Sequence, residues 1–135
     1  MAIRLARHYG PLAIVLLSFA LRLYTLGDAN VWWDEAYSVW LARMPLADVL
    51  RVTAADVHPP LYYALLHGWI RLAGDGEFAI RFLSALIGTL SVALVYPLGA
   101  RLLDRRWAAL GSLLLAVSVL HVWWSQETRM YILAA

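Results

Sequence analysis

A charge-free apolar segment, Phe82 to Ala100, limits most strongly what this chain can fold into. A helix needs about 20 residues to cross a hydrocarbon core of about 30 Å. Two further segments are of similar character: His8 to Leu26, whose one charge is Arg22, and Trp107 to Gln126, which contains His121. Because a segment in lipid must satisfy its own backbone hydrogen bonds, each is predicted to be a helix. The expected fold is an all-α, polytopic membrane protein with three transmembrane helices.

Composition supports a membrane protein and excludes several chemistries. Of 135 residues, 63% are hydrophobic and 15% are charged, whereas soluble domains are about half apolar and a quarter charged. The chain has no cysteine, which excludes disulfides and thiol nucleophiles. All eleven basic residues are arginine, and the net charge of +2 is too small and dispersed to indicate a nucleic-acid partner.

The arginines predict the orientation. The apolar stretch 59–70 is too short to cross, so it is predicted to lie on the membrane surface with the rest of the loop 27–77. The arginines of residues 101–106 then share a side with those of residues 4–7, as the positive-inside rule prefers. We expect a multi-pass protein of the cell (plasma) membrane, with a cytoplasmic N-terminus and with loop 27–77 and residues from Glu127 onward outside.

The two ends of the chain leave further questions. Residues 1–29 could instead be a cleaved signal peptide, but Arg22 and the bulky Leu26 argue against a small-residue cleavage site. The apolar run 130–133 is interpreted as the start of a fourth span. Residues 1–135 are therefore expected to form the N-terminal portion of one longer transmembrane module.

Loop 27–77 holds seven of the nine carboxylates, including the adjacent pair Asp34 and Glu35 in the run WWDEAY. Asp34 can cap a short helix. One carboxylate of the pair can instead face a substrate, because partial burial among aromatic rings suits a general base. Spacing alone favours the capping interpretation.

Two other motifs carry candidate site residues. The run HPPLYY, residues 58–63, places a histidine at a proline-fixed helix entry, where it could donate to a phosphate, or could simply be a surface turn. After the third span, Arg129 could bind a phosphate bidentately and Glu127 could pair with it or bind a sugar hydroxyl. The alternative there is an aromatic belt followed by an ordinary charged helix end.

The polar residues near the spans have simpler interpretations. Arg22 needs a partner, for which Asp28 is a candidate. His67 and His121 are interpreted as packing residues. A divalent cation held by His58, Asp34, Glu35 and Glu127 is possible, but their spacing has no tetrahedral signature, and no cofactor is certain.

Together these motifs resemble the N-terminal module of the GT-C class of polytopic membrane glycosyltransferases. They are most similar to the superfamily of dolichyl-phosphate-mannose–protein mannosyltransferases and aminoarabinose transferases. The matching pieces are Asp34-Glu35, the entry at residues 58–63, the run EFAIRF at 77–82, and SQETRMY at 125–131. The resemblance covers nearly the whole chain and lies in the combination of motifs.

The resemblance implies transfer of a hexose or pentose from a polyprenyl-phosphate donor on the non-cytoplasmic face, usually with inversion. It implies that Asp34 acts as base or orients the acceptor, that Glu127 is the second acidic residue, and that Glu35 belongs to the catalytic acids. His58, Tyr62, Tyr63 and Arg129 are the expected substrate-binding residues. The acceptor (protein, lipid or glycan) is open, and this chain alone is expected to be inactive.

Two other function classes fit the sequence. A non-catalytic membrane accessory module would explain the short length and the small number of spans. A transporter fragment would need polar groups near the bilayer midplane, where the second span offers only the hydroxyls of Ser84, Thr89 and Ser91. The glycosyltransferase is the leading hypothesis.

Overall fold

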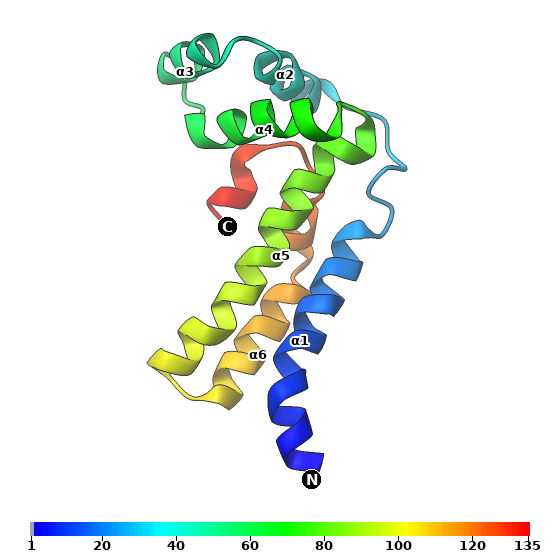
Figure 1. Cartoon of the computed structure of the whole chain (residues 1–135), viewed down its shortest axis with the longest axis vertical. Coiled ribbons are helices and arrows are strands. Elements are labelled where there is room, and N and C mark those ends of the chain that lie inside the picture. Colours follow the sequence, from blue (N-terminus) through cyan, green and yellow to red (C-terminus); the bar gives the residue numbers. More distant parts are fainter. Residues whose placement is uncertain (1) are drawn as a thin grey trace.

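The computed structural model describes the backbone of residues 2–135 and the side chains of residues 9–135, and this described part contains helices and turns but no strand. Three helices, α1, α5 and α6, run side by side, and α2, α3 and α4 lie across one end of them (Figure 1). The helices are α1 (Ala2–Leu23), α2 (Trp33–Ala42), α3 (Leu46–Ala54), α4 (Pro60–Ala73), α5 (Glu77–Leu102), α6 (Arg105–Ala116), α7 (Val119–Ser125) and the 3-10 helix η1 (Met130–Leu133).

The long helices pack through small residues and expose leucines. On α5 the buried face includes Ser84, Ala85 and Gly88, and on α6 it includes Ala108, Ser112 and Ala116. The opposite face of α5 exposes large side chains at intervals of four residues: Leu86, Leu90, Leu94 and Leu98. Close backbone approach through small residues, with leucines turned outward, is typical of helices packed in lipid.

The predicted spans are confirmed only in part. Among the described residues, α5 alone is long and apolar enough to cross a bilayer by itself. The first predicted span, 8–26, lies in α1 and ends at Leu23, earlier than predicted; side chains are described from Tyr9 on, and the stretch Tyr9–Leu23 is apolar. The prediction of one helix over 107–126 is wrong, because α6 and α7 meet at a 59° bend.

The bend has a physical cause that involves Arg22. Ser118 caps the new helix by accepting the His121 N–H at 3.5 Å, and the carbonyl of Ala116, at the end of α6, accepts from Arg22 Nη1 at 3.3 Å. Arg22 is completely buried and also contacts the Ser18 and Ser125 hydroxyls and His121 Nδ1, the last at 2.7 Å. The predicted pairing with Asp28 is therefore wrong: hydroxyls, carbonyls and an imidazole satisfy this guanidinium.

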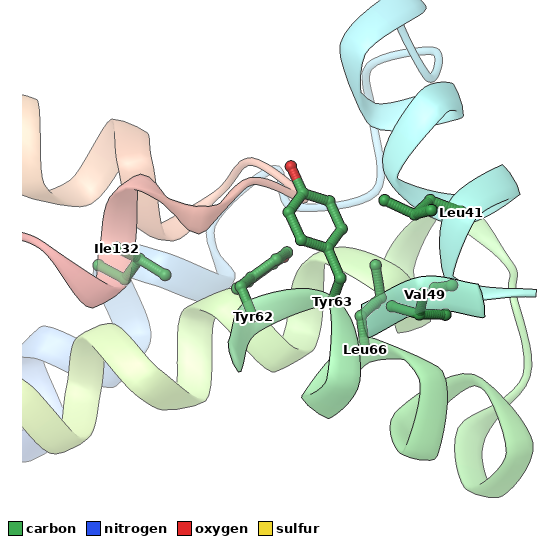
Figure 2. Packing of buried hydrophobic residues seen from close by; sticks show 7 residues of the cluster. Leu41, Val49, Tyr62, Tyr63, Leu66 and Ile132 are labelled. Carbon is green, nitrogen blue, oxygen red and sulfur yellow. The ribbon is translucent and has the colours of Figure 1, made fainter. Parts of the chain in front are cut away.

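The short helices form a cap with its own core. Tyr62 and Tyr63 of α4 lie between Leu41, Val49 and Leu66 on one side and Ile132 of η1 on the other (Figure 2). The apolar run 130–133 forms η1, which packs against α4, and the start of a fourth span there stays a prediction. The helix α4 begins at the second of the two prolines, Pro60, with Pro59 as its N-cap, and lies across the bundle end (Figure 1). It stops at Gly74, whose φ of 81° suits glycine.

Two segments that are far apart in the sequence lie at the capped end of the bundle. Loop 27–77 and the segment after α7 meet there, while the α5–α6 turn with Arg101 and Arg105 lies at the opposite end, near the N-terminus (Figure 1). The arginines of residues 4–7, on which the predicted orientation partly rests, lie outside the described side chains. The arrangement therefore separates the acidic loop from the turn that holds the arginine cluster.

Candidate active site at the capped end

Arg129 brings distant predicted site residues together. Its side chain is only 6% exposed, and its Nη2 lies 3.5 Å from His58 Nε2 and 3.9 Å from Asp34 Oδ2. Its Nη1 donates to the Asp34 carbonyl at 3.4 Å, and its Nε is buried without a partner among the described residues. The contacts of the Arg129 terminal nitrogens to Asp34, His58 and the Tyr131 hydroxyl are all 3.4 Å or longer, so none of them is a short, strong hydrogen bond.

Asp34 and Glu35 have different environments. Helix α2 begins at Trp33, and its N-cap is Trp32 without a side-chain cap, so the prediction that Asp34 is the N-cap is wrong. The side chain of Asp34 is 39% exposed beside Arg129. Of the two adjacent carboxylates, Asp34 is the one whose side chain is exposed to solvent.

Glu35 is completely buried and holds three parts of the site together. Its two oxygens accept from Arg81 at 2.9 and 2.6 Å, and it accepts the Thr128 N–H at 3.0 Å. Burial alone would raise the pKa of Glu35, but the hydrogen bonds and charge of Arg81 and the Thr128 N–H hold it below its usual value. The carboxylate stays ionised in this pair, which favours a supporting role over the predicted catalytic one.

Arg81 ties the same pair to the start of loop 27–77. Its other N–H groups donate to the carbonyls of Leu26, Ala29 and Asn30. The guanidinium thereby joins α5 to the loop after α1, to α2 through Glu35 and, through the same carboxylate, to Thr128. In the sequence, Arg81 stands out only as part of the run EFAIRF at 77–82, and no local pattern there predicts its pairing with Glu35.

His58 is held on several sides. Its Nδ1 lies 2.7 Å from Asp56 Oδ2, and its ring centroid lies 5.8 Å from those of Tyr37 and Tyr63. The Val57 N–H and the His58 imidazole hold the pKa of Asp56 below its usual value. The remaining nitrogen, Nε2, faces Arg129.

Glu127 lines a separate cleft of about 490 Å³ beside this group. Burial raises the pKa of Glu127 above its usual value, and the charges of Glu35 and Asp34 add to this effect, while a Trp123 hydrogen bond and Arg129 oppose it. Trp32 and Trp123, on opposite segments, expose about half of their surface. The other lining residues are Thr25, Leu26, Ala29, Asn30, Glu35, Arg81 and Gln126.

The remaining predicted residues lie in the core. Tyr62 and Tyr63 are fully buried; the Tyr62 hydroxyl contacts Ser84 Oγ at 2.8 Å, and the Tyr63 hydroxyl donates to Met130 Sδ at 3.4 Å. This burial favours support of the site over the predicted substrate contact. His67 is buried against the Ala42 carbonyl, as expected for a packing residue. Within the described residues, no three His, Asp or Glu side chains lie close enough to hold a metal ion together.

Comparison with known proteins gives one family. Residues 57–133 match the profile of the dolichyl-phosphate-mannose-protein mannosyltransferase family. No curated protein and no solved structure matches the chain significantly. The matched range covers more than half of the chain, including His58, Arg81, Glu127 and Arg129. The chain therefore belongs to the dolichyl-phosphate-mannose-protein mannosyltransferase family, a family of membrane-embedded glycosyltransferases of the GT-C type.

Proposed function

We propose that this chain carries the transfer site of a membrane glycosyltransferase that moves a sugar from a polyprenyl-phosphate donor to an acceptor hydroxyl on the non-cytoplasmic face. One observation carries the proposal: an accessible carboxylate, Asp34, lies within 3.9 Å of a buried arginine, Arg129, that also contacts His58. A base and two phosphate-binding groups are what this reaction needs. The separation of the arginine turn from this end supports the outward orientation.

The reaction is a single displacement at the anomeric carbon. Asp34 accepts the proton of the acceptor hydroxyl while that oxygen bonds to the anomeric carbon. The bond from this carbon to the phosphate oxygen breaks, and its electron pair leaves with the polyprenyl phosphate. Arg129 and His58 stabilise the charge on the leaving phosphate. Attack opposite to the leaving group inverts the anomeric configuration.

The cleft beside Glu127 is the proposed binding place of a sugar ring. The Trp32 and Trp123 rings offer apolar faces, and Glu127 and Gln126 offer hydrogen bonds to hydroxyl groups. A polar ligand with apolar C–H faces, such as a hexose or pentose, matches this lining. The acceptor class (protein, lipid or glycan) is left to experiment.

Asp34→Asn in the full-length, membrane-embedded protein tests the proposal. The substitution keeps the size of the side chain but removes the base, so we expect transfer from polyprenyl-phosphate mannose to membrane acceptors to fall by about 100-fold or more. Release of polyprenyl phosphate and labelling of acceptors are measured together, with and without EDTA to detect a cation requirement.

Asp28→Asn is the matched control, because Asp28 is an exposed carboxylate of the same loop. It should keep normal transfer. Near-normal turnover of Asp34→Asn, at wild-type expression and thermal stability, would reject the role of Asp34.

A further inference from the structure

The environment of His58 contains a residue to which neither the motifs nor the family match assigns a role. Asp56 lies two residues before His58, in the turn between α3 and α4, and its Oδ2 is 2.7 Å from His58 Nδ1. Its other oxygen accepts the N–H of Val57 at 2.7 Å. The carboxylate is thus fixed by its own backbone and presents one oxygen to the imidazole.

The other groups around the imidazole lie beside the ring and at Nε2. Tyr37 of α2 and Tyr63 of α4 pack beside the ring, the latter edge-on at 83°. Arg129, the residue before η1, places its Nη2 at 3.5 Å from His58 Nε2, and the same Nη2 lies 3.9 Å from Asp34 Oδ2. With Nδ1 taken by Asp56, Nε2 is the nitrogen that points to the site.

Hydrogen-bond chemistry then decides what His58 can do. Asp56 is ionised and can only accept, so Nδ1 carries a proton and donates to it. Nε2 can donate to a phosphate oxygen only when the imidazole is also protonated there. A carboxylate on Nδ1 compensates the charge of that imidazolium, and the phosphate bound between His58 and Arg129 completes the neutralisation.

We infer that Asp56 is a positioning residue of the donor-phosphate site: it fixes the His58 ring so that Nε2 and Arg129 face the same phosphate. This inference rests on the proposed function, because it takes the His58–Arg129 pair as the place of the donor phosphate. Asp56 itself does not touch the donor. Its effect on donor binding passes through His58.

A double-mutant cycle between positions 56 and 58 tests the inference. The full-length membrane protein is compared as wild type, Asp56→Asn, His58→Lys and the double variant, with KM for polyprenyl-phosphate mannose as the readout. Asp56→Asn keeps the size of the side chain but removes the charge and leaves one carbonyl oxygen for the two donors, His58 Nδ1–H and the Val57 N–H. In the wild-type background it should raise the donor KM by about fivefold to tenfold, with a smaller change in kcat.

The lysine background separates the positioning role from a structural one. The Lys ammonium is cationic without a carboxylate and donates in every direction. Adding Asp56→Asn to His58→Lys should therefore change the donor KM by less than about twofold. An equal rise in both backgrounds would mean that Asp56 only shapes the turn, and no rise in the wild-type background would remove it from the site; either result overturns the inference.

His58→Ala distinguishes failure of the inference from failure of the proposed function. If His58→Ala raises the donor KM but Asp56→Asn leaves it unchanged, the positioning role of Asp56 is refuted while the proposed function stands. An unchanged donor KM for His58→Ala would refute the phosphate role of His58 and, with it, the inference. Melting temperatures of all variants in detergent show whether a variant failed to fold. Asp48→Asn provides the control, because the Asp48 side chain is a partly exposed carboxylate on α3.

Discussion

Two buried arginines, Arg22 and Arg81, stabilise the two regions of this molecule in different ways. At the capped end, Arg81 pairs with the carboxylate of Glu35 and with three loop carbonyls. Between the long helices, Arg22 has no carboxylate within ion-pair distance, although all nine lie in the described part of the chain. Neutral hydroxyls, carbonyls and the His121 ring surround it instead.

The difference shows how each arginine contributes to the site. Arg81 and Glu35 form a charge pair whose partners come from α5, α2 and the Thr128 backbone, so the pair fixes the relative position of three segments. Arg22 fixes the bend between α6 and α7, which directs the chain toward Glu127 and Arg129. Removal of the arginine should lower stability by different amounts in the two regions. Loss of Arg81 leaves the Glu35 carboxylate buried without its partner, whereas loss of Arg22 leaves no buried charge.

Arg81→Met should have the largest effect on stability. It leaves the Glu35 carboxylate buried and unpaired, which costs about 3–5 kcal/mol. Thermal unfolding in detergent measures this as a large drop in Tm. The double variant Arg81→Met with Glu35→Gln should recover part of the loss, and a double variant as unstable as the single one would contradict the charge-pair explanation.

Arg22→Met should be less damaging. The partners of Arg22 are neutral, so the substitution removes several hydrogen bonds and leaves the Ala116 carbonyl at the end of α6 without the Arg22 donor. We expect the free energy of unfolding to fall by about 2–3 kcal/mol. The same Tm measurement applies, and the comparison with Arg81→Met is the readout. If Arg22→Met proved as destabilising as Arg81→Met, the contrast between an ionic and a neutral environment would not hold.

Gly88→Ala should disturb the Arg22 region by close contact alone. A Cβ on Gly88 would lie 2.9 Å from Ser125 Cβ and 3.0 Å from Arg22 Nε, so α7 or the guanidinium must move. We expect a loss of about 1–2 kcal/mol. Gly111→Ala is the matched control, since a Cβ there meets no atom within 4 Å; equal Tm shifts for the two variants would refute the predicted crowding.

Acidification should have the smallest effect, and it should act on the Arg81 region. Because the folded-state pKa of Glu35 lies below its ordinary value near 4.5, its charge stabilises the fold above that value. This stabilisation is lost as pH falls through the lower, folded-state pKa. The Tm difference between wild type and Glu35→Gln should therefore shrink below about pH 4.5. A difference independent of pH would mean that the charge of Glu35 adds nothing.

Local patterns in the sequence were enough for the long helix over 82–100 and for the grouping of motifs at one end of the molecule. The apolar segment 82–100 predicts a helix because a chain in lipid has no other way to satisfy its backbone. The short turn between α5 and α6 returns the chain, which places residues 125–131 at the same end as loop 27–77. The prediction that loop 27–77 and the residues from Glu127 onward lie on the same side follows from this connectivity.

Tertiary contacts decided which residue does what at that end. Asp34 and Glu35 are adjacent and chemically alike, yet one is accessible and the other is locked to Arg81, 46 residues away, and to Thr128, 93 residues away. The bend near Ser118 and the burial of Tyr62 depend equally on distant partners. The spacing of apolar residues and the length of an apolar segment indicate the surroundings of a single helix. The partner of a buried polar group is chosen where several helices meet, so only the folded chain reveals it.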